Sequence, residues 1–418
     1  MTSARTIEVC ADWDGLGGPV PMGQLVAASV RGKEVFSFEY DRDWIGGPNC
    51  VALDPALTLF AGPQYPAGPA SNFGVFLDSC PDRWGRVLMQ RREAYQARIE
   101  GREEQRLVEL DYLLGVHDAA RMGALRFREG GAFLDDQDAL AAPPWTSLRE
   151  LEHACAQLER DGSEGQADYG HWLRLLLAPG SSLGGARPKA SVIGLDGRLW
   201  IAKFPSLRDG DDVGAWEGVV HELAKRAGLF VPVARVERFA SPQHTFLSRR
   251  FDRTSSGARL HFASAMTLLE RSDGDDAALG ASYLELAEVL TTSGARPSED
   301  LEELFRRIAF SVCVSNTDDH LRNHGFLLDG DGWRLAPAYD MNPDPHGNGL
   351  RLNISDTDNA QDLELVADVA PFFRVADPGS VIEEVKGAVR TWSEVATKRG
   401  LGDATQRRMR RAFRVADR

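Results

Sequence analysis

The chain has 418 residues, of which 43% are hydrophobic and 26% charged, a balance that is typical of a folded protein and excludes a fully disordered one. Its 48 basic and 62 acidic side chains give a net charge of −14, which argues against broad, non-specific binding of nucleic acid. A local basic groove stays compatible with this charge. The length is sufficient for two or three domains.

The five cysteines are scattered and form no CxxC pair, so the sequence predicts reduced thiols rather than a disulfide framework or a zinc site. The N-terminal stretch MTSARTIEVCADWDG has no long apolar core, and we expect no signal peptide. No run approaches the roughly 18 apolar residues that a membrane-spanning helix requires. We therefore expect a cytoplasmic protein without a membrane partner.

The N-terminal third is predicted to be rich in β-structure. Residues 5–60 contain TIEVCADW and EVFSFEY, apolar runs between Gly and Pro turns that are typical of strands. A helix is predicted from Asp78, because PDRWGRVLMQRREAYQAR has a proline near its start and helical apolar spacing. A short helix and two strands are expected within residues 109–135. After the linker QDALAAPPWTS, Ser147 and Glu150 predict a capping box at the start of the next helix.

The pattern changes after Gly180. The segment KASVIGLDGRLWIAKFP has two apolar runs around a DG turn, which predicts a β-hairpin. A helix, WEGVVHELAKRAGL, and two strands, VARVERF and HTFLSRRF, are expected next. From about residue 260 the expected elements are helical: SYLELAEVL, EDLEELFRRIAFSVCV and SVIEEVKGAVRTWSEVATKR. A β-containing lobe therefore precedes a helical lobe.

The segment from Ser315 to Asp340 concentrates acids, histidines and asparagines directly after an apolar helix. Phosphoryl transfer requires an acid to hold the incoming hydroxyl, and acids or amides to hold Mg²⁺. Protein kinases place the catalytic Asp five residues before a metal-binding Asn, which is the spacing of Asp318 and Asn323. A second metal-binding Asp follows a hairpin, and FLLDGDGWRLAPAYD supplies this hairpin and ends on Asp340.

This interpretation requires further residues upstream. A Gly-rich loop should precede a hairpin, and SSLGGARPKA supplies Gly184 and Gly185. A strand should then carry a lysine, which Lys203 provides. An acid on the following helix should position this lysine; Glu217 fits best, with Glu222 as the alternative. Each part occurs often by chance, but all of them in the required order indicate a kinase more strongly.

Several motifs together resemble the HipA family of serine/threonine kinases, toxins of bacterial toxin–antitoxin modules. They are SSLGGARPKA, WIAKFP, SRRFDR, NTDDHLRN and APAYD, with a looser likeness in FEYDRDW, LDSCPDRWGRVLMQRR and DYLLGVHDAARMGALRF. The resemblance implies an α+β fold, a two-lobed protein-kinase-like core preceded by a small β-rich subdomain. That subdomain would span residues 1–130, the N-lobe with the Gly-rich loop 131–255, and the helical C-lobe 256–418.

The resemblance also implies roles for individual residues. Asp318 would be the catalytic base, and Asn323 and Asp340 would bind Mg²⁺. Residues 246–251 would form the hinge beside adenine. The residues implied to bind ATP, or to support the loops around it, are Ser182, Gly184, Gly185, Lys203, Glu217, Arg249, Phe251 and His320.

Ser182 lies where the family carries a regulatory serine in the Gly-rich loop, and Ser181 is the alternative. Autophosphorylation there ejects the loop in relatives and stops the kinase, since an added phosphate would repel those of ATP. One departure is Pro188, which lacks the N–H that could bind a phosphate but could stiffen the turn.

The function that the resemblance implies is an ATP- and Mg²⁺-dependent serine/threonine kinase associated with persistence. It would phosphorylate a translation component such as glutamyl-tRNA synthetase. A small helix-turn-helix antitoxin similar to HipB would supply most contacts to operator DNA. The alternatives are a catalytically silent scaffold that acts as a co-repressor with its antitoxin, and a small-molecule kinase.

Other interpretations of the same residues stay open. His320 and His324 could bind zinc with Asp318 or Asp319, although the Glu of HExxH is missing. We expect His320 to brace the loop, His324 to be an ordinary polar residue and Asp319 to be a solvated neighbour. Asp252 is expected to pair locally with the arginine that follows it. As a turn residue, Asp340 would need no metal.

Overall fold

The computed structural model describes residues 4–68, 70–134, 142–177, 185 and 187–418. The chain divides into two compact units. Unit 1 comprises Met1–Arg208, Phe239–Ser241 and Asp252–Ala263, and unit 2 comprises Asp209–Arg238, Pro242–Phe251 and Ser264–Arg418. The division predicted at residues 130 and 255 stays a prediction.

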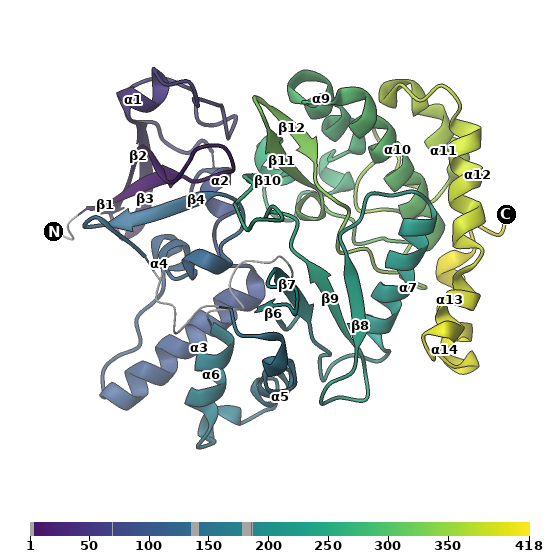
Figure 1. The fold of residues 1–418 in the computed structure, drawn as a ribbon, viewed down its shortest axis with the longest axis horizontal. Coiled ribbons are helices and arrows are strands. Elements are labelled where there is room, and N and C mark those ends of the chain that lie inside the picture. The colour runs from purple at the N-terminus through teal and green to yellow at the C-terminus, as the bar shows by residue number, and fades with distance from the viewer. Residues whose placement is uncertain (1–3, 69, 135–141, 178–184, 186) are drawn as a thin grey trace. The chain divides into compact units, whose positions relative to one another are not determined.

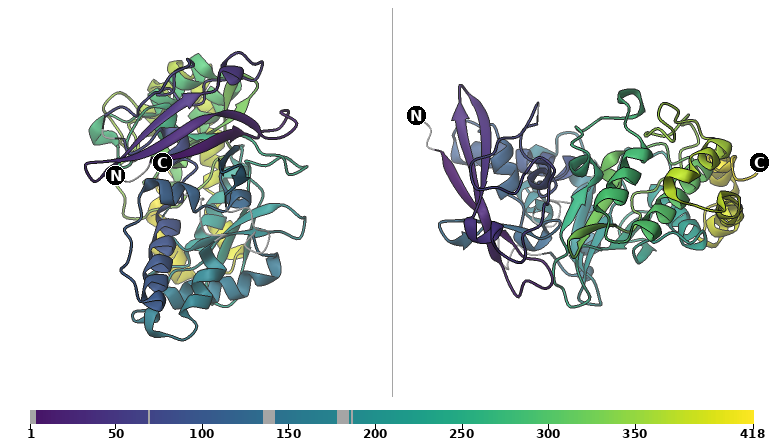
Figure 2. Two further views of the ribbon diagram at one scale, coloured as in Figure 1. Left: turned by 90° about the vertical axis from the view of Figure 1, so that its left-hand side faces the viewer. Right: turned by 90° about the horizontal axis from the view of Figure 1, so that it is seen from above.

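Unit 1 begins with a five-stranded antiparallel sheet, which confirms the β-structure expected near the N-terminus. The strand order is β3-β2-β1-β4-β5, and the three long N-terminal strands lie side by side (Figure 2). Ile7 and Val9 of the central strand β1 are fully buried, because alternate side chains of this strand face the core. The strands are β1 (Arg5–Ala11), β2 (Val20–Val30), β3 (Lys33–Tyr40), β4 (Leu125–Glu129) and β5 (Ala132–Phe133).

The longest helix of unit 1 starts later than predicted. It begins at Arg83 rather than near Asp78, because the Asp82 carboxylate accepts the Gly85 N–H at 2.7 Å and caps the first turn. The predicted capping box at Ser147 is wrong: this residue lies in a 3₁₀ turn and its side chain makes no capping bond. The helices are α1 (Arg42–Ile45), α2 (Gly74–Leu77), α3 (Arg83–Glu100), α4 (Glu109–Leu114), α5 (Leu148–Leu158) and α6 (Tyr169–Leu177).

The predicted hairpin after the Gly-rich segment is confirmed. Strands β6 (Lys189–Ile193) and β7 (Leu199–Lys203) pair antiparallel, with Lys189 opposite Lys203. Gly197 in the connecting turn has φ +72°, a conformation that favours glycine. The hairpin therefore presents its two lysines at neighbouring positions on one face.

Unit 2 is mainly helical, as expected (Figure 1). Its central helix α10 packs against α9 and α12. Leu301, Phe305 and Ile308 of this helix are fully buried. The helices are α7 (Val213–Arg226), α8 (Ala265–Leu268), α9 (Tyr283–Ser293), α10 (Pro297–Val314), α11 (Leu363–Asp368), α12 (Pro378–Val389), α13 (Trp392–Lys398) and α14 (Asp403–Met409).

The helical run expected near the C-terminus forms two helices, α12 and α13. The Thr391 hydroxyl donates to the Ala388 carbonyl at 2.7 Å at the break, a competing bond that ends α12. The strands of unit 2 form two antiparallel hairpins, and β10 (Phe262–Ser264) lies at the boundary of the units. The paired strands are β8 (Ala234–Glu237) with β9 (Thr245–Arg249), and β11 (Gly325–Asp329) with β12 (Gly332–Leu335).

The five cysteines are free thiols, as predicted, and four of them are buried. Burial raises the pKa of the Cys80 thiol to about 12, so this thiol is protonated and unreactive at neutral pH. In the described part of the chain, no helix combines the length and apolar character required to cross a membrane.

Candidate active site

The segment that carries the predicted catalytic residues begins where helix α10 ends. Ser315 caps this end in a left-handed conformation with φ +51°, and its hydroxyl donates to the Ala412 carbonyl at 2.7 Å. The chain then forms a loop that contains the 3₁₀ turn η6 (Leu321–Asn323) and enters β11. We call residues 315–324 the catalytic loop. Its first residue is therefore fixed to the helical core.

Asp318 and Asn323 are joined directly within this loop. The Asn323 Nδ2 donates to the Asp318 carbonyl at 3.0 Å, and the His320 N–H donates to the same oxygen at 2.9 Å. The Asp318 side chain is exposed, whereas Asn323 is 8% exposed. Because the amide nitrogen is held by the carbonyl, the amide oxygen of Asn323 is the atom oriented for another partner.

Asp340 follows β12 and is half-buried. Its φ of +57° is uncommon for a residue other than glycine, and such conformations concentrate at functional sites. The Asn342 Nδ2 donates to Asp340 Oδ1 at 3.3 Å, and the Asn342 N–H donates to Asn316 Oδ1 at 3.2 Å. These bonds connect the segment of Asp340 to the catalytic loop.

The two predicted metal ligands, Asn323 and Asp340, are oxygen donors. In the described ranges, no three His, Cys, Asp or Glu side chains are close enough to hold a metal ion. Asp340 and Asn323 offer a carboxylate and an amide oxygen, the hard oxygen ligands that Mg²⁺ prefers, and Mg²⁺ commonly takes further ligands from substrate phosphates.

Asp319 is not a solvated neighbour, and His324 is not an ordinary polar residue; both predictions were wrong. Asp319 is 5% exposed and His324 is 3% exposed, and Nε2 of His324 lies 3.1 Å from Asp319 Oδ1. Burial acts to raise the pKa of Asp319, but His324 and a hydrogen bond from Tyr283 outweigh it and the pKa is lowered. Asp319 is therefore a buried carboxylate at neutral pH.

His320 contributes its backbone to the loop. Its N–H bonds to Asp318 as described, while its Nδ1 is buried without a hydrogen-bond partner among the described residues. The structure thus places His320 beside the predicted base, and the role of its side chain stays a prediction.

The predicted ATP lysine lies in unit 1, at the end of β7. Lys203 is half-buried, and its ladder partner Lys189 is 2% exposed with Nζ 3.0 Å from Asp82 Oδ2. Two lysines opposite each other in a ladder repel, so the Asp82 carboxylate offsets one of the two charges. The Pro188 carbonyl accepts the Phe204 N–H at 2.9 Å, and the stiffening of the turn by the proline ring stays a prediction.

The part of the Gly-rich loop that would carry the regulatory serine lies outside the described residues. This applies to Ser181, Ser182 and Gly184. Gly185 is described, is exposed and has φ +83°, a conformation that a glycine adopts without strain.

The two candidate acids on helix α7 of unit 2 differ in burial. Glu217 is 4% exposed, whereas Glu222 has a side chain that is 37% exposed and pairs with Arg226 at 3.2 Å. A buried acid requires a partner, and a surface pair of this kind contributes little. The predicted pairing of Glu217 with Lys203 stays a prediction.

The predicted hinge is connected to the catalytic loop within unit 2. The Phe251 ring packs against Tyr339 with centroids 5.4 Å apart, and the Tyr339 hydroxyl donates to the Arg322 carbonyl at 2.7 Å. Arg249 ends β9, and its N–H donates to the Val233 carbonyl at 2.8 Å. No pattern in the sequence indicated the contact of Phe251 with Tyr339, which joins residues far apart in the chain.

The expected local pairing of Asp252 is present in unit 1. Asp252 is fully buried, its Oδ2 lies 2.6 Å from Nη1 of Arg253, and the same oxygen accepts the Gly123 N–H at 2.9 Å. The Arg253 guanidinium also donates to the Arg121 carbonyl at 2.9 Å. Asp252 and Arg253 therefore attach their segment to the part of unit 1 around Gly123.

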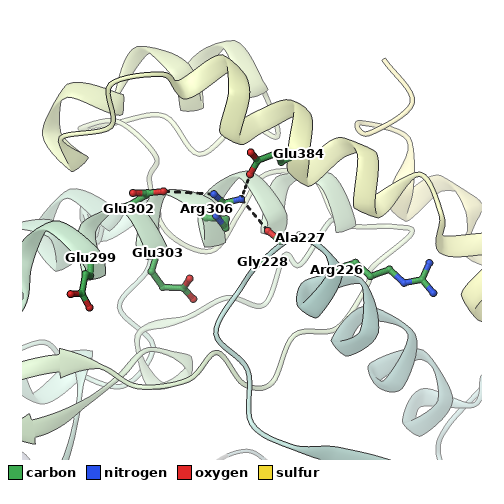
Figure 3. A pocket seen from close by; sticks show the side chains of 8 residues that line it. All are labelled: Arg226, Ala227, Gly228, Glu299, Glu302, Glu303, Arg306 and Glu384. Carbon is green, nitrogen blue, oxygen red and sulfur yellow. Dashed lines mark hydrogen bonds and ion pairs between the residues drawn. The ribbon is translucent and has the colours of Figure 1, made fainter.

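A cavity of about 500 Å³ in unit 2 is lined by none of the predicted site residues (Figure 3). At its centre, Arg306 donates to the Ala227 carbonyl at 3.1 Å and to the Glu384 carboxylate at 2.7 Å. Because Arg306 joins α7, α10 and α12 through these bonds, the arginine has a structural role here.

Comparison with known proteins gives a family and a fold. Residues 181–398, more than half of the chain, match the model of the HipA-like C-terminal domain. Two curated relatives are named, provisionally, as kinases: Y4mE of Sinorhizobium fredii, 29% identical over 187 residues, and a protein of Haemophilus influenzae, 27% identical over 180 residues. The matches cover 38% and 39% of this chain but 41% and 52% of the relatives, so the chain spans about half the length of the curated relatives it matches.

A solved structure of HipA from Shewanella oneidensis, in complex with HipB and operator DNA, is similar over 98% of this chain and 95% of its own. The TM-score is 0.63 at 15% identity, a likeness that concerns the fold alone. The predicted α+β, protein-kinase-like fold is confirmed by this comparison.

Proposed function

We propose that this chain, which belongs to the HipA family, is an ATP- and Mg²⁺-dependent serine/threonine protein kinase. The observation that carries the proposal is the bond from the Asn323 amide to the Asp318 carbonyl. It joins the candidate base and the candidate metal ligand, which follow each other in the sequence in the order that kinases use. The bond from the Asn342 N–H to Asn316 Oδ1, which connects the segment of Asp340 to the same loop, supports the assignment.

In this proposal, each residue has a separate task. The exposed carboxylate of Asp318 accepts or orients the proton of the substrate hydroxyl. Asn323 and Asp340 hold Mg²⁺, which when bound offsets the negative charge of the phosphates. Lys203 binds ATP phosphates, and Phe251 lies in the hinge beside adenine.

The partners are proposed from the same family membership. HipA of Shewanella oneidensis was solved with HipB and operator DNA, and we propose that a small helix-turn-helix antitoxin also binds this chain. The net charge of −14 favours leaving most DNA contacts to such a partner. The proposed substrate is a translation component such as glutamyl-tRNA synthetase, and the proposed regulation is autophosphorylation of Ser182.

Intact-mass spectrometry of the purified protein with and without Mg-ATP tests the proposal, beside Asp318→Ala, Ser182→Ala and Ser181→Ala. We expect one added phosphate in the wild type, none in Asp318→Ala, and none in whichever serine variant removes the acceptor. A parallel incubation with cytosolic extract detects phosphorylation of other proteins or of small molecules. ATP binding without any transfer would favour the silent scaffold, and absence of ATP binding would contradict the kinase assignment.

A further inference from the structure

The two consecutive acids of the catalytic loop face in different directions. Asp318 is exposed, whereas Asp319 is 5% exposed. A charged carboxylate is costly to bury unless it is paired and hydrogen-bonded. The contacts of Asp319 therefore indicate why the chain keeps an acid at this buried position.

Asp319 contacts two helices of unit 2 and the end of its own loop. Its Oδ2 accepts the Tyr283 hydroxyl at 2.6 Å and the Ser311 hydroxyl at 3.3 Å, and its Oδ1 lies 3.1 Å from His324 Nε2. Tyr283 is the first residue of α9, Ser311 lies in the last turns of α10, and His324 ends the loop. One carboxylate thus connects two helices to both sides of the loop.

The partners of Asp319 are themselves rigidly placed. Tyr283 is fully buried and its ring meets His324 edge-on, with centroids 5.6 Å apart and an interplanar angle of 87°. The His324 carbonyl accepts the Ala265 N–H at 2.8 Å at the start of α8. The Asp319 backbone follows directly on Asp318, and His324 follows directly on Asn323. Anchors at 319 and 324 therefore fix the backbone on either side of both proposed active-site residues.

We propose that Tyr283, Asp319 and His324 are positioning residues, a loop brace that holds Asp318 and Asn323 in the geometry needed for phosphoryl transfer. The inference rests on the proposed kinase function, and it identifies residues outside the ATP and metal contacts on which the chemical step depends. Small displacements of reacting groups cost large factors in rate. Loss of the brace should accordingly affect kcat more than the binding of nucleotide.

The kinetic test uses Tyr283→Phe, Asp319→Asn and Asp319→Ala. We expect Tyr283→Phe to lower kcat by about 10-fold and Asp319→Ala by about 100-fold, with less than about 3-fold change in KM for ATP. Asp319→Asn should recover part of the loss, because its amide oxygen still accepts from Tyr283. Two variants serve as matched controls: Tyr112→Phe, which also removes one side-chain hydrogen bond, and Asp300→Asn, which changes a buried acid on α10 outside the loop.

Hydrogen–deuterium exchange gives a readout that needs no activity. Peptides covering residues 315–326 should exchange at least about 10-fold faster in Tyr283→Phe and Asp319→Ala than in the wild type, and remain unchanged in both controls. Unchanged exchange in this loop would overturn the brace, even in an active kinase. Faster exchange in the two variants, together with a wild type that transfers no phosphate, would contradict the proposed function while supporting the brace. Equal losses of kcat in the variants and the controls would indicate general destabilisation and also overturn it.

Discussion

The Asn323 side-chain amide donates to the Asp318 backbone carbonyl at 3.0 Å, so the proposed metal ligand and the proposed base share one hydrogen bond. The spacing of the two residues in the sequence indicated that they act together, but not how. The bond orients the amide oxygen and also limits the motion of the loop. A substitution at position 323 should therefore affect the metal and the base at once.

Asn323→Ala should raise the Mg²⁺ concentration for half-maximal activity and lower kcat by about 10- to 100-fold, because it removes a ligand and the bond to Asp318. Titration of Mg²⁺ in a phosphoryl-transfer assay measures both effects. Asn359→Ala, which removes an amide-to-carbonyl bond to Leu350, serves as the control. Wild-type Mg²⁺ dependence in Asn323→Ala would contradict the assigned ligand.

Substitution of the two acids of α7, Glu217 and Glu222, should have different effects on kcat/KM for ATP. We expect Glu217→Gln to lower kcat/KM for ATP by about 10-fold or more, since the buried Glu217 is proposed to position Lys203. Glu222→Gln should stay within about 2-fold of the wild type, because its pair with Arg226 is at the surface. Steady-state kinetics of both variants decides between them, and a larger effect at Glu222 would reverse the assignment.

The buried pair of Lys189 and Asp82 should contribute strongly to folding. Lys189→Met leaves the Asp82 carboxylate buried without its cation, which should lower the free energy of unfolding by about 3–5 kcal/mol. The double variant Lys189→Met/Asp82→Asn removes both charges and keeps a capping side chain for α3, so much of the loss should be recovered. Urea denaturation of the three proteins measures the difference; a double variant less stable than Lys189→Met alone would contradict this account.

The stability of unit 1 should fall in mild acid because of His261. Burial lowers the pKa of His261 to about 3, against an ordinary value of 6.5. Between these values the unfolded chain binds a proton that the folded chain does not, so stability is complete above about pH 6.5 and decreases as the pH falls. The slope approaches about 1.4 kcal/mol per pH unit. Denaturation curves between pH 7 and pH 4.5 should show a smaller slope in His261→Gln, and equal slopes would exclude this histidine as the cause.

Much of the fold followed from local patterns. Alternating apolar residues predicted the N-terminal strands, the DG turns predicted hairpins β6–β7 and β11–β12, and helical spacing predicted α7, α9 and α10. The predicted helix boundaries were wrong where a side chain forms a hydrogen bond with the backbone at a helix end. Asp82 caps α3 later than expected, and Thr391 ends α12 within an otherwise helical pattern. These side-chain bonds depend on the exact backbone geometry, which periodicity does not specify.

The sequence by itself determined the order of the candidate active-site residues, because the spacing of Asp318 and Asn323 and the hairpin before Asp340 are properties of a short segment. Only the tertiary structure decided that Asp319 and His324 are buried, since their partner Tyr283 lies 36 residues from Asp319 in the chain. The same holds for Lys189 and Asp82, which are 107 residues apart. Local spacing can identify groups suited to a reaction. Which polar side chains become buried depends on the helices and strands that pack around them.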